Sequence, residues 1–326
     1  MSLTGLITKA QSGFFTVHLD EGGRTLTCTA AGRLTKGKFD AHALAVGDRV
    51  SIEEVPSEGF ANGRVIGRFD RKLVLSRMDP IANTNGREIQ QVIVANLDLC
   101  LFVFACADPK FAPRMLDRYL VGAEAQHLPS IIVATKVDLI GHSAAKTLFA
   151  TYQKIGYNVI FTSKKFAADL VTPVSDPLDA YGAREVRAVL QNKISVLTGK
   201  SGAGKSSLLN SLKHGLAQEV GAVSPTLHKG RHTTVAPQLF QLDESSWIAD
   251  TPGLRGYAVW DVDDRELDGY FRDIAPLVSG CAFGNCTHTD ETACAVRRAV
   301  STGALSRDRY ESYVKLREML STQKRW

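Results

Sequence analysis

Three groups of residues in this chain have the types and spacing of chemical sites, and the first suits phosphate. Residues 199–207 fit the pattern G-x-x-x-x-G-K-[ST], with a strand-like run before it and a helix-like run after it. The glycines let successive backbone N–H groups curl around phosphate oxygens. A Gly/Ser-rich turn is the alternative, but both flanks favour a nucleotide. The predicted phosphate-binding residues are Gly199, Lys200, Ser201, Gly202, Ala203, Gly204, Lys205, Ser206 and Ser207.

Two side chains of this loop have expected individual roles. Lys205 would neutralise the β- and γ-phosphates, and the Ser206 hydroxyl suits a Mg²⁺ ligand. After the strand-like run 247–249, Asp250 is the expected outer-sphere partner of Mg²⁺, and Gly253 would offer its N–H to the γ-phosphate. Alone, Asp-Thr-Pro-Gly is equally an ordinary turn. The phosphate loop upstream favours a nucleotide-sensing switch.

The second group suits the recognition of guanine. Thr135, Lys136, Val137 and Asp138 form a T-K-x-D element at the end of the apolar run 130–134. A carboxylate at Asp138 would accept bonds from guanine N1–H and from the exocyclic amine, whereas adenine presents the wrong pattern. The stem of Lys136 can lie over the base. A surface charge pair is the alternative, but a strand end in a protein with a phosphate loop favours guanine. Thr162 and Ser163 would cap the base with backbone N–H groups.

The third group suits a metal ion. Cys281-x4-Cys286-x-His288-x5-Cys294 supplies three sulfurs and one imidazole, a set typical of tetrahedral structural Zn²⁺. Four protein ligands leave no position for a substrate, so catalysis is not expected there. A set of unrelated thiols is the alternative, which the close spacing disfavours. In a segment of about 60 residues, one zinc ion would supply much of the stability.

The elements that must position these groups divide the 326 residues into three predicted domains. Short alternating runs indicate an OB-type, RNA-binding β-barrel over 1–80. Apolar runs that alternate with helical patterns indicate an α/β domain with a parallel sheet over 81–262, which carries the phosphate loop and the base motif. The polar, helical segment 263–326 contains the metal cluster. The expected barrel strands are 5–9, 14–19, 24–29, 49–53 and 63–66.

Composition is that of a globular protein, with 44% hydrophobic and 22% charged residues. The excess of 39 basic over 34 acidic residues, +5, permits a nucleic-acid partner without requiring one. Basic residues recur in both flanking domains and suggest an RNA surface contacted at several points, although solvated loops explain the count equally well. These residues are Arg24, Arg33, Lys36, Lys38, Arg64, Arg68, Arg71, Lys72, Arg297, Arg298, Arg307 and Arg309.

The expected cellular location follows from two features that the sequence does not show, a membrane helix and a signal peptide. The most apolar stretch, 99–107, is shorter than the ~20 residues of a membrane helix, and the first residues do not resemble a signal peptide. We therefore expect a cytoplasmic protein that has no membrane partner and acts as a monomer. Cys28, Cys100 and Cys106 are scattered and are interpreted as small core residues.

The order of the motifs is unusual. The base motif and its cap precede the phosphate loop, and the switches follow, which is the order of a circularly permuted GTPase. A resemblance to a known family rests on this motif order, the phosphate loop, the cysteine cluster and the run Gly-Arg-His-Thr-Thr at 230–234. The whole chain resembles the ribosome small-subunit-dependent GTPase A family (RsgA, also YjeQ). One departure is Thr135 where Asn is common. Threonine keeps a hydroxyl contact but not a carboxamide.

The resemblance implies switch and hydrolysis residues. The segment 228–235 corresponds to switch I, in which Thr233 or Thr234 would reach Mg²⁺. Leu254 stands where many GTPases have a water-orienting Gln, and the family shares this substitution. His232 is then the candidate catalytic residue, because an imidazole can orient or activate water. A solvated loop histidine is the alternative. Switch II also leads directly into the C-terminal domain, so a γ-phosphate-driven shift could reposition that domain.

The resemblance further implies a GTPase that binds the small ribosomal subunit and its rRNA in late maturation. It would hydrolyse GTP to GDP and phosphate, with turnover stimulated by the subunit. One alternative is a GTP-dependent factor for another RNA such as tRNA. Another is a P-loop ATPase, which Asp138 disfavours because a site built from hydrogen bonds rejects a mismatched base by as much as ~10⁴.

Overall fold

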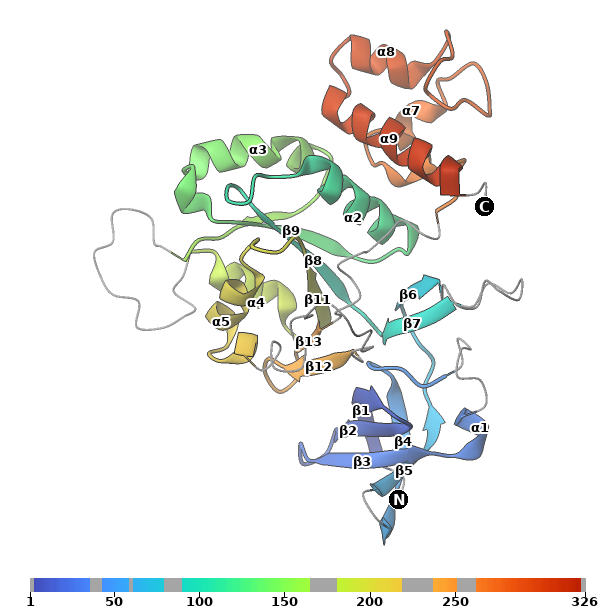
Figure 1. Cartoon of the computed structure of the whole chain (residues 1–326), viewed down its shortest axis with the longest axis vertical. Helices are drawn as coiled ribbons and strands as arrows, with labels where there is room; N and C mark the ends of the chain where they lie inside the picture. The colour runs from blue at the N-terminus through green and yellow to red at the C-terminus, as the bar shows by residue number, and fades with distance from the viewer. Residues whose placement is uncertain are drawn as a thin grey trace, which may run out of the picture.

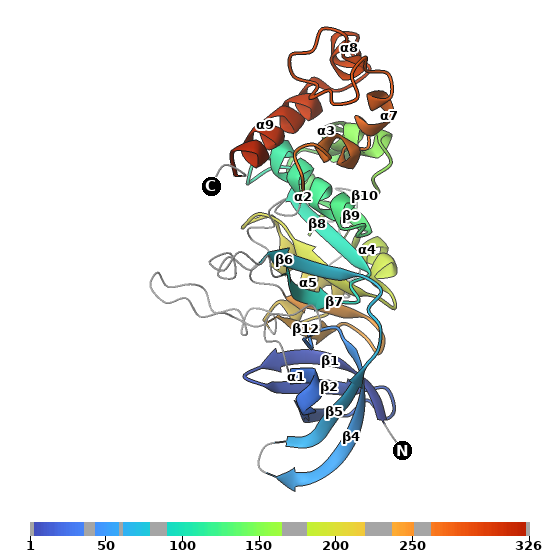
Figure 2. The same ribbon diagram turned by 90° about the vertical axis from the view of Figure 1, so that its right-hand side faces the viewer.

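The computed structural model describes residues 3–35, 43–58, 61–78, 90–164, 181–218, 237–250 and 262–323. Three parts follow one another along the long axis of the molecule (Figure 1). The N-terminal barrel lies at one end, an α/β domain in the middle and a helical C-terminal domain at the other end. The view turned by 90° shows the same order (Figure 2).

The N-terminal part is a closed barrel of five strands. The strand order is β1-β2-β3-β5-β4, and an additional pairing of β4 with β1 closes it. Alternate residues such as Ile7, Val17 and Ile52 point inward and form its core. The five strands expected from the sequence are thereby confirmed. The elements are β1 (Leu3–Gln11), β2 (Phe14–Leu19), β3 (Thr25–Ala30), α1 (Gly32–Thr35), β4 (Arg49–Glu58) and β5 (Ala61–Arg68).

The middle part is built on five parallel strands in the order β10-β9-β8-β11-β13, with β12 antiparallel at the edge. These strands are β8 (Leu99–Ala105), β9 (Ser130–Thr135), β10 (Val159–Phe161), β11 (Ile194–Thr198), β12 (Gln238–Gln241) and β13 (Trp247–Asp250). The strands that precede the base motif and the phosphate loop belong to one sheet, although the two motifs occur in permuted order along the chain. This parallel sheet confirms the predicted α/β fold.

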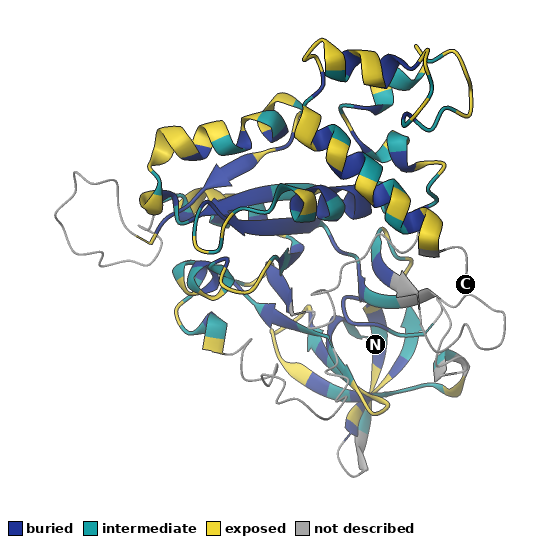
Figure 3. Cartoon of the chain, turned by 45° about the horizontal axis from the view of Figure 1, so that its top comes forward, coloured by how far each residue is buried: buried dark blue, intermediate teal, exposed yellow. Residues whose placement is uncertain are grey.

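Helices cover both faces of this sheet (Figures 1 and 3). They are α2 (Pro113–Ala125), α3 (His142–Lys154), α4 (Ala183–Leu190) and α5 (Lys205–Leu212). On β8, Phe102 and Phe104 belong to the core under α2 and α3, whereas Leu101 and Val103 belong to the core under α4 and α5. Because successive side chains of a strand alternate between faces, the continuous apolar run of β8 supplies both cores.

A two-stranded ribbon lies at the transition between barrel and sheet. It pairs β6 (Val74–Met78) with β7 (Gln90–Ala95) in antiparallel fashion. One further bridge, Lys9 to Gln238, connects β1 of the barrel with β12. Residue 80, the expected first domain boundary, falls in the sequence between β6 and β7 and outside the described residues. The boundaries at 80 and 262 remain predictions.

The C-terminal part is helical, as expected. It contains the 3₁₀ helix η5 (Leu267–Tyr270) and the helices α7 (Ala275–Val278), α8 (Ala295–Ser301) and α9 (Arg307–Gln323). Leu267, Phe271 and Tyr313 are fully buried in its core, which also receives Val121 from α2. Among the described residues, no helix is both long and apolar enough to cross a membrane.

Candidate nucleotide site and metal centre

The phosphate loop connects the end of β11 with the start of α5. A Cβ atom on Gly199 would lie 2.1 Å from the Val103 carbonyl oxygen of β8, so this close approach requires glycine. Gly204 has φ +89°, in the left-handed region, immediately before the helix begins at Lys205. The Lys205 ammonium donates to the carbonyls of Gly199 (2.6 Å) and Lys200 (2.9 Å). The lysine therefore lies across the loop that precedes it.

The base motif follows the end of β9 and contacts the phosphate loop directly. The Thr135 hydroxyl donates to the Ala203 carbonyl at 2.6 Å, so threonine keeps a hydroxyl contact in place of the more common asparagine. Lys136 adopts left-handed backbone (φ +57°), and the 3₁₀ helix η2 (Val137–Leu139) follows it. The turn leaves Asp138 exposed at the carboxyl edge of the sheet.

The predicted cap lies beside the base motif. Ser163 donates its hydroxyl to the Asp138 carboxylate at 2.6 Å, and the Val137 amide donates to the Thr162 carbonyl at 3.3 Å. Because β9 and β10 are parallel neighbours, their carboxyl ends meet at one edge. The two segments that the sequence analysis assigned to guanine are therefore brought together.

A turn that sequence reasoning missed lies between the base motif and the phosphate loop. Lys136 donates its ammonium to the carbonyl of Asp108, directly after β8. A Cβ atom on Gly202 would lie 3.5 Å from Pro109 Cδ. The apolar run of β8 was recognised from its sequence, but the turn after it was not assigned to the site. Since β8 lies between β9 and β11, the strand order requires its end to be there.

The switch residues lie mostly outside the described ranges. Asp250 ends β13, beside β11, so its backbone is at the same edge of the sheet. The segments 219–236 and 251–261, which contain His232, Thr233, Thr234, Gly253 and Leu254, are not among the described residues. The described carboxyl ends of β8, β9, β10, β11 and β13 nevertheless form one edge, the usual ligand position in such sheets.

The four predicted metal ligands gather in the C-terminal domain. One donor atom each from Cys281, Cys286, His288 and Cys294 lies within 4.8 Å of all the others. Three thiol sulfurs and one imidazole form a soft, compact donor set that fits a tetrahedral metal ion. Of the three other cysteines, all buried, Cys28 and Cys106 have pKa values raised by burial to about 11. This burial supports their interpretation as core residues.

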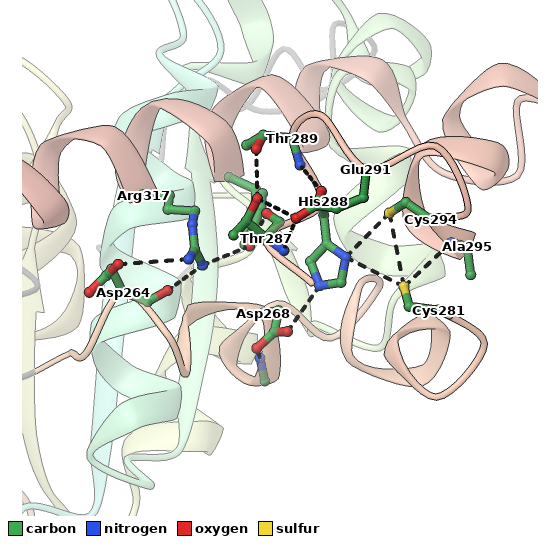
Figure 4. A network of polar contacts seen from close by, with 12 residues as sticks. Asp264, Asp268, Cys281, Thr287, His288, Thr289, Glu291, Cys294, Ala295 and Arg317 are labelled. Carbon is green, nitrogen blue, oxygen red and sulfur yellow. Dashed lines mark hydrogen bonds and ion pairs between the residues drawn. The ribbon is translucent and has the colours of Figure 1, made fainter. Parts of the chain in front are cut away.

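The imidazole is oriented by a second contact (Figure 4). His288 Nδ1 lies 3.3 Å from Cys294 Sγ and 3.6 Å from Cys281 Sγ, while Nε2 lies 3.0 Å from the Asp268 carboxylate. This contact with His288 holds the pKa of Asp268 below its ordinary value. A carboxylate behind a ligating histidine fixes the ring and raises its basicity as a ligand.

Backbone N–H groups and a carboxylate shape the rest of this loop. The Ala295 amide donates to Cys281 Sγ and the Arg297 amide to Cys294 Sγ, both at 3.4 Å. Such bonds stabilise negative charge on sulfur. Burial alone would raise the pKa of Glu291, but hydrogen bonds from the backbone and hydroxyl of Thr287 help to lower it to about 2. The loop around the donors is therefore ordered by its own polar contacts.

Two of the basic residues counted toward an RNA surface are largely buried and paired instead. Arg71 forms an ion pair with Asp48 through Nε and Oδ1 at 2.7 Å. Arg309 is 3% exposed and pairs with Asp117 and Asp273. Both charges are already compensated inside the molecule, so neither guanidinium is available to a phosphate backbone. Their inclusion among the surface cations was wrong.

A parallel sheet with a phosphate loop, preceded in the chain by its base motif, defines a circularly permuted GTPase. The solved structures agree. The chain matches "YloQ, a circularly permuted GTPase" with a TM-score of 0.70 and 28% identity, over 99% of this chain and 96% of that one. It matches YjeQ from Thermotoga maritima with a TM-score of 0.72 and 28% identity, over 98% and 99%.

The sequence comparisons define the family. The family model described as RsgA GTPase matches residues 68–260. The small ribosomal subunit biogenesis GTPase RsgA of Gemmatimonas aurantiaca is 40% identical over 319 residues, 98% of either chain. The protein of the same name from Chlorobaculum parvum is 31% identical over 320 residues, also 98% of either chain. The chain belongs to the RsgA GTPase family, and it is accordingly a GTP hydrolase.

Proposed function

We propose that this GTPase binds the small ribosomal subunit and acts in its late maturation. It would hydrolyse GTP to GDP and phosphate faster when the subunit is bound. The names of the full-length relatives support this substrate. The observation that carries the proposal for the site is the hydrogen bond from Thr135 to Ala203 at 2.6 Å. It joins the base motif to the phosphate loop at one edge of the sheet, so one nucleotide can contact both.

At the phosphate end, the backbone N–H groups of residues 199–207 would surround the β- and γ-phosphates. Lys205 already lies over this loop and would exchange carbonyl partners for phosphate oxygens. Ser206, one of Thr233 and Thr234, and Asp250 through water would hold Mg²⁺. When bound, Mg²⁺ offsets charge on the phosphate oxygens. Gly253 would donate its N–H to the γ-phosphate.

At the base end, Asp138 would accept the two donors on the guanine edge, and Ser163 would hold that carboxylate in place. The backbone around Val137, Thr162 and Ser163 would close the pocket. Asp138→Asn should weaken GTP binding and favour xanthine nucleotides, because the amide can donate to the oxygen that replaces the guanine amine. ATP binding as tight as GTP binding would contradict this assignment and favour an ATPase.

Hydrolysis would depend on His232, because Leu254 cannot hydrogen-bond a water. The imidazole would orient or activate the attacking water. Turnover of the isolated protein should therefore be slow. The test is His232→Ala, which should lower subunit-stimulated turnover while GTP affinity is kept. Unchanged stimulated turnover would remove His232 from the mechanism.

The flanking domains would supply the contacts to rRNA. One structural Zn²⁺ held by Cys281, Cys286, His288 and Cys294 would stabilise the C-terminal domain, which presents Phe283 at 55% exposure between two of these ligands. Metal analysis of the purified protein should give one zinc per chain. The protein would act as a monomer in the cytoplasm. Chelation should unfold residues 263–326 without removing the nucleotide site.

The decisive experiment compares GTPase rates with purified small subunits, large subunits and tRNA. Stimulation by small subunits alone is the expected result. Stimulation only by tRNA would overturn the ribosomal assignment and favour a factor for another RNA. A Lys205→Ala variant, deprived of its phosphate contact, serves as the inactive reference in each reaction.

A further inference from the structure

Helix α2 of the GTPase domain presents two acidic residues to the C-terminal domain. Asp117 and Glu124 are seven residues apart, which is two helical turns, so they share one face of the helix. Each carboxylate accepts a hydrogen bond from a tyrosine of its own domain and another from an arginine of the C-terminal domain. We call Asp117–Tyr152–Arg309 the buried triad and Glu124–Tyr157–Arg272 the outer triad.

The buried triad is almost closed to solvent. Asp117 Oδ1 accepts from Arg309 Nη1 at 2.5 Å and from the Tyr152 hydroxyl at 2.8 Å. The same guanidinium donates to Asp273 of its own domain through Nε at 3.0 Å and Nη2 at 2.8 Å. Its Cζ lies 4.6 Å from the centre of the Phe271 ring. Arg309 therefore has partners on both sides of the interface.

The outer triad repeats the arrangement nearer to water. Glu124 Oε1 accepts from Arg272 Nε at 2.8 Å and from the Tyr157 hydroxyl at 3.0 Å. The guanidinium stacks 4.0 Å above the Tyr157 ring, and Nη1 donates to the Gly156 carbonyl at 3.1 Å. The side chains of Arg272 and Glu124 are 39% and 25% exposed, so water can replace each partner.

Only part of the contact between the domains is apolar, where Val121 of α2 is buried in the C-terminal core. Beside the buried triad, a pocket of about 380 Å³ that opens to solvent lies between Phe111 and Tyr152 on one side and Ser306 and Asp308 on the other. Around this pocket the two domains do not pack against each other, and the contacts described beside it are the charged hydrogen bonds of the buried triad.

We propose that the two triads form a latch that holds the C-terminal domain on α2 reversibly, so that this domain can separate as a folded unit. Separation divides each triad into satisfied halves. Arg309 keeps Asp273, Asp117 keeps Tyr152, and Glu124 keeps Tyr157, while Arg272 becomes hydrated. Neither half is left with a buried charge that has lost every partner, the condition that makes most buried ion pairs costly to break. The proposal is independent of the ribosomal substrate.

The test is the full-length double variant Asp117→Asn, Glu124→Gln. Both changes lie in the GTPase domain and keep an acceptor for each tyrosine, so the C-terminal domain is chemically intact. Hydrogen exchange of backbone amides in 267–278 and 306–310 should become about tenfold faster, and small-angle scattering should show a larger maximum dimension. Zinc content and the exchange of β8 should not change. Glu311→Gln is the matched control, because its pair with Arg114 joins α9 to α2 at 3.3 Å in solvent.

Two results would overturn the latch. Wild-type exchange and scattering in the double variant would mean that the triads do not hold the domain. Loss of zinc or unfolding of 263–326 would mean that they belong to the folding of the C-terminal domain. Ionic strength gives a second measurement on the unmodified chain. Exchange near Arg272 should accelerate between about 0.05 and 0.5 M salt, because screening acts on exposed charges, and insensitivity to salt would contradict an ionic latch.

Discussion

The barrel is joined to the GTPase domain mainly through backbone bonds, whereas the C-terminal domain is joined through side-chain charges. At the barrel joint, the Ala95 amide donates to the Val46 carbonyl at 2.8 Å, and β1 pairs with β12 at Lys9 and Gln238. Asn96 Nδ2 donates to the Gly47 carbonyl at 2.9 Å. These bonds prevent the barrel from sliding along the GTPase domain, because each bond forms in only one register of the two chain segments.

A buried ion pair lies next to the barrel joint, between the barrel and the segment that leads from β5 to β6. Arg71 donates to the Asp48 carboxylate through Nε at 2.7 Å and Nη2 at 2.8 Å, and to the Ala43 carbonyl at 2.6 Å. Asp48 is fully buried and also accepts from the Ala45 amide. Separation would break these backbone bonds and disturb the chain next to this network. We therefore expect the barrel to move with the GTPase domain and the C-terminal domain to move independently of it.

The largest expected effect is at the barrel joint. Asp48→Ala leaves the buried Arg71 without its carboxylate and removes the acceptor of Ala45, so it should lower the free energy of unfolding by about 4 kcal/mol. Denaturant unfolding measures this. Asp20→Ala, which removes the surface pair with Arg49 at 2.5 Å, is the control and should cost less than 1 kcal/mol, about the value of exposed pairs. Equal effects would contradict the importance of the buried pair.

The next effect concerns close approach of the backbone. Gly47 has φ +89°, and a Cβ atom there would lie 2.0 Å from the Ala95 carbonyl oxygen. Gly47→Ala should therefore cost about 3 kcal/mol, from both clash and strain. Gly22 has a similar φ of +76° but nothing within 4 Å, so Gly22→Ala should cost only about 1 kcal/mol. Thermal unfolding of both variants separates the cost of the steric clash from the cost of the strained backbone. A loss of stability at Gly47 as small as that at Gly22 would mean that the backbone at the joint shifts to accommodate the Cβ atom.

At the C-terminal joint, Arg309→Ala should cost about 3 kcal/mol at neutral pH and less in acid. Burial raises the pKa of Asp117, and the charge of Arg309 opposes this rise. Without the arginine, the folded-state pKa lies further above the unfolded value. The variant then loses stability as pH rises from the unfolded-state pKa of Asp117 to its folded-state pKa. The difference in stability between variant and wild type should therefore shrink from pH 8 toward pH 5. Arg309→Lys keeps the charge and should show a weaker dependence. A pH-independent deficit would exclude Asp117 as its cause.

Sequence periodicity predicted the five barrel strands and the helical character of the C-terminal domain, but not the short helices α1, α7 and α8. The alternation over 14–19 predicted β2, and the polar composition of 263–326 predicted helices such as α9. Motif spacing likewise predicted the phosphate loop, the base motif and the four metal donors, and the structure brings those four donors together. These features are local, because a strand, a loop or a ligand set is written in neighbouring residues.

The joints could not be predicted in this way, because their partners are distant in the chain. Arg309 contacts Asp117 across 192 residues, and a count of charges assigned it to an RNA surface. Asp108 was overlooked for the same reason, since its contact with Lys136 depends on the order of strands in the sheet. The hydroxyl contact of Thr135 was anticipated, but its partner in the phosphate loop was visible only in the fold.

The smallest expected effects distinguish the two ends of the latch. Glu124→Gln should cost about 0.5 kcal/mol at low salt and less at high salt, since the pair with Arg272 is partly hydrated. Double-mutant cycles that combine it with Arg272→Gln, at two salt concentrations, measure the coupling. A coupling that persists in high salt would place the outer triad with the buried ion pairs. The two joints would then differ only in the backbone bonds of the barrel joint. The charged contacts of the C-terminal domain would be as strong as the buried ion pair of the barrel.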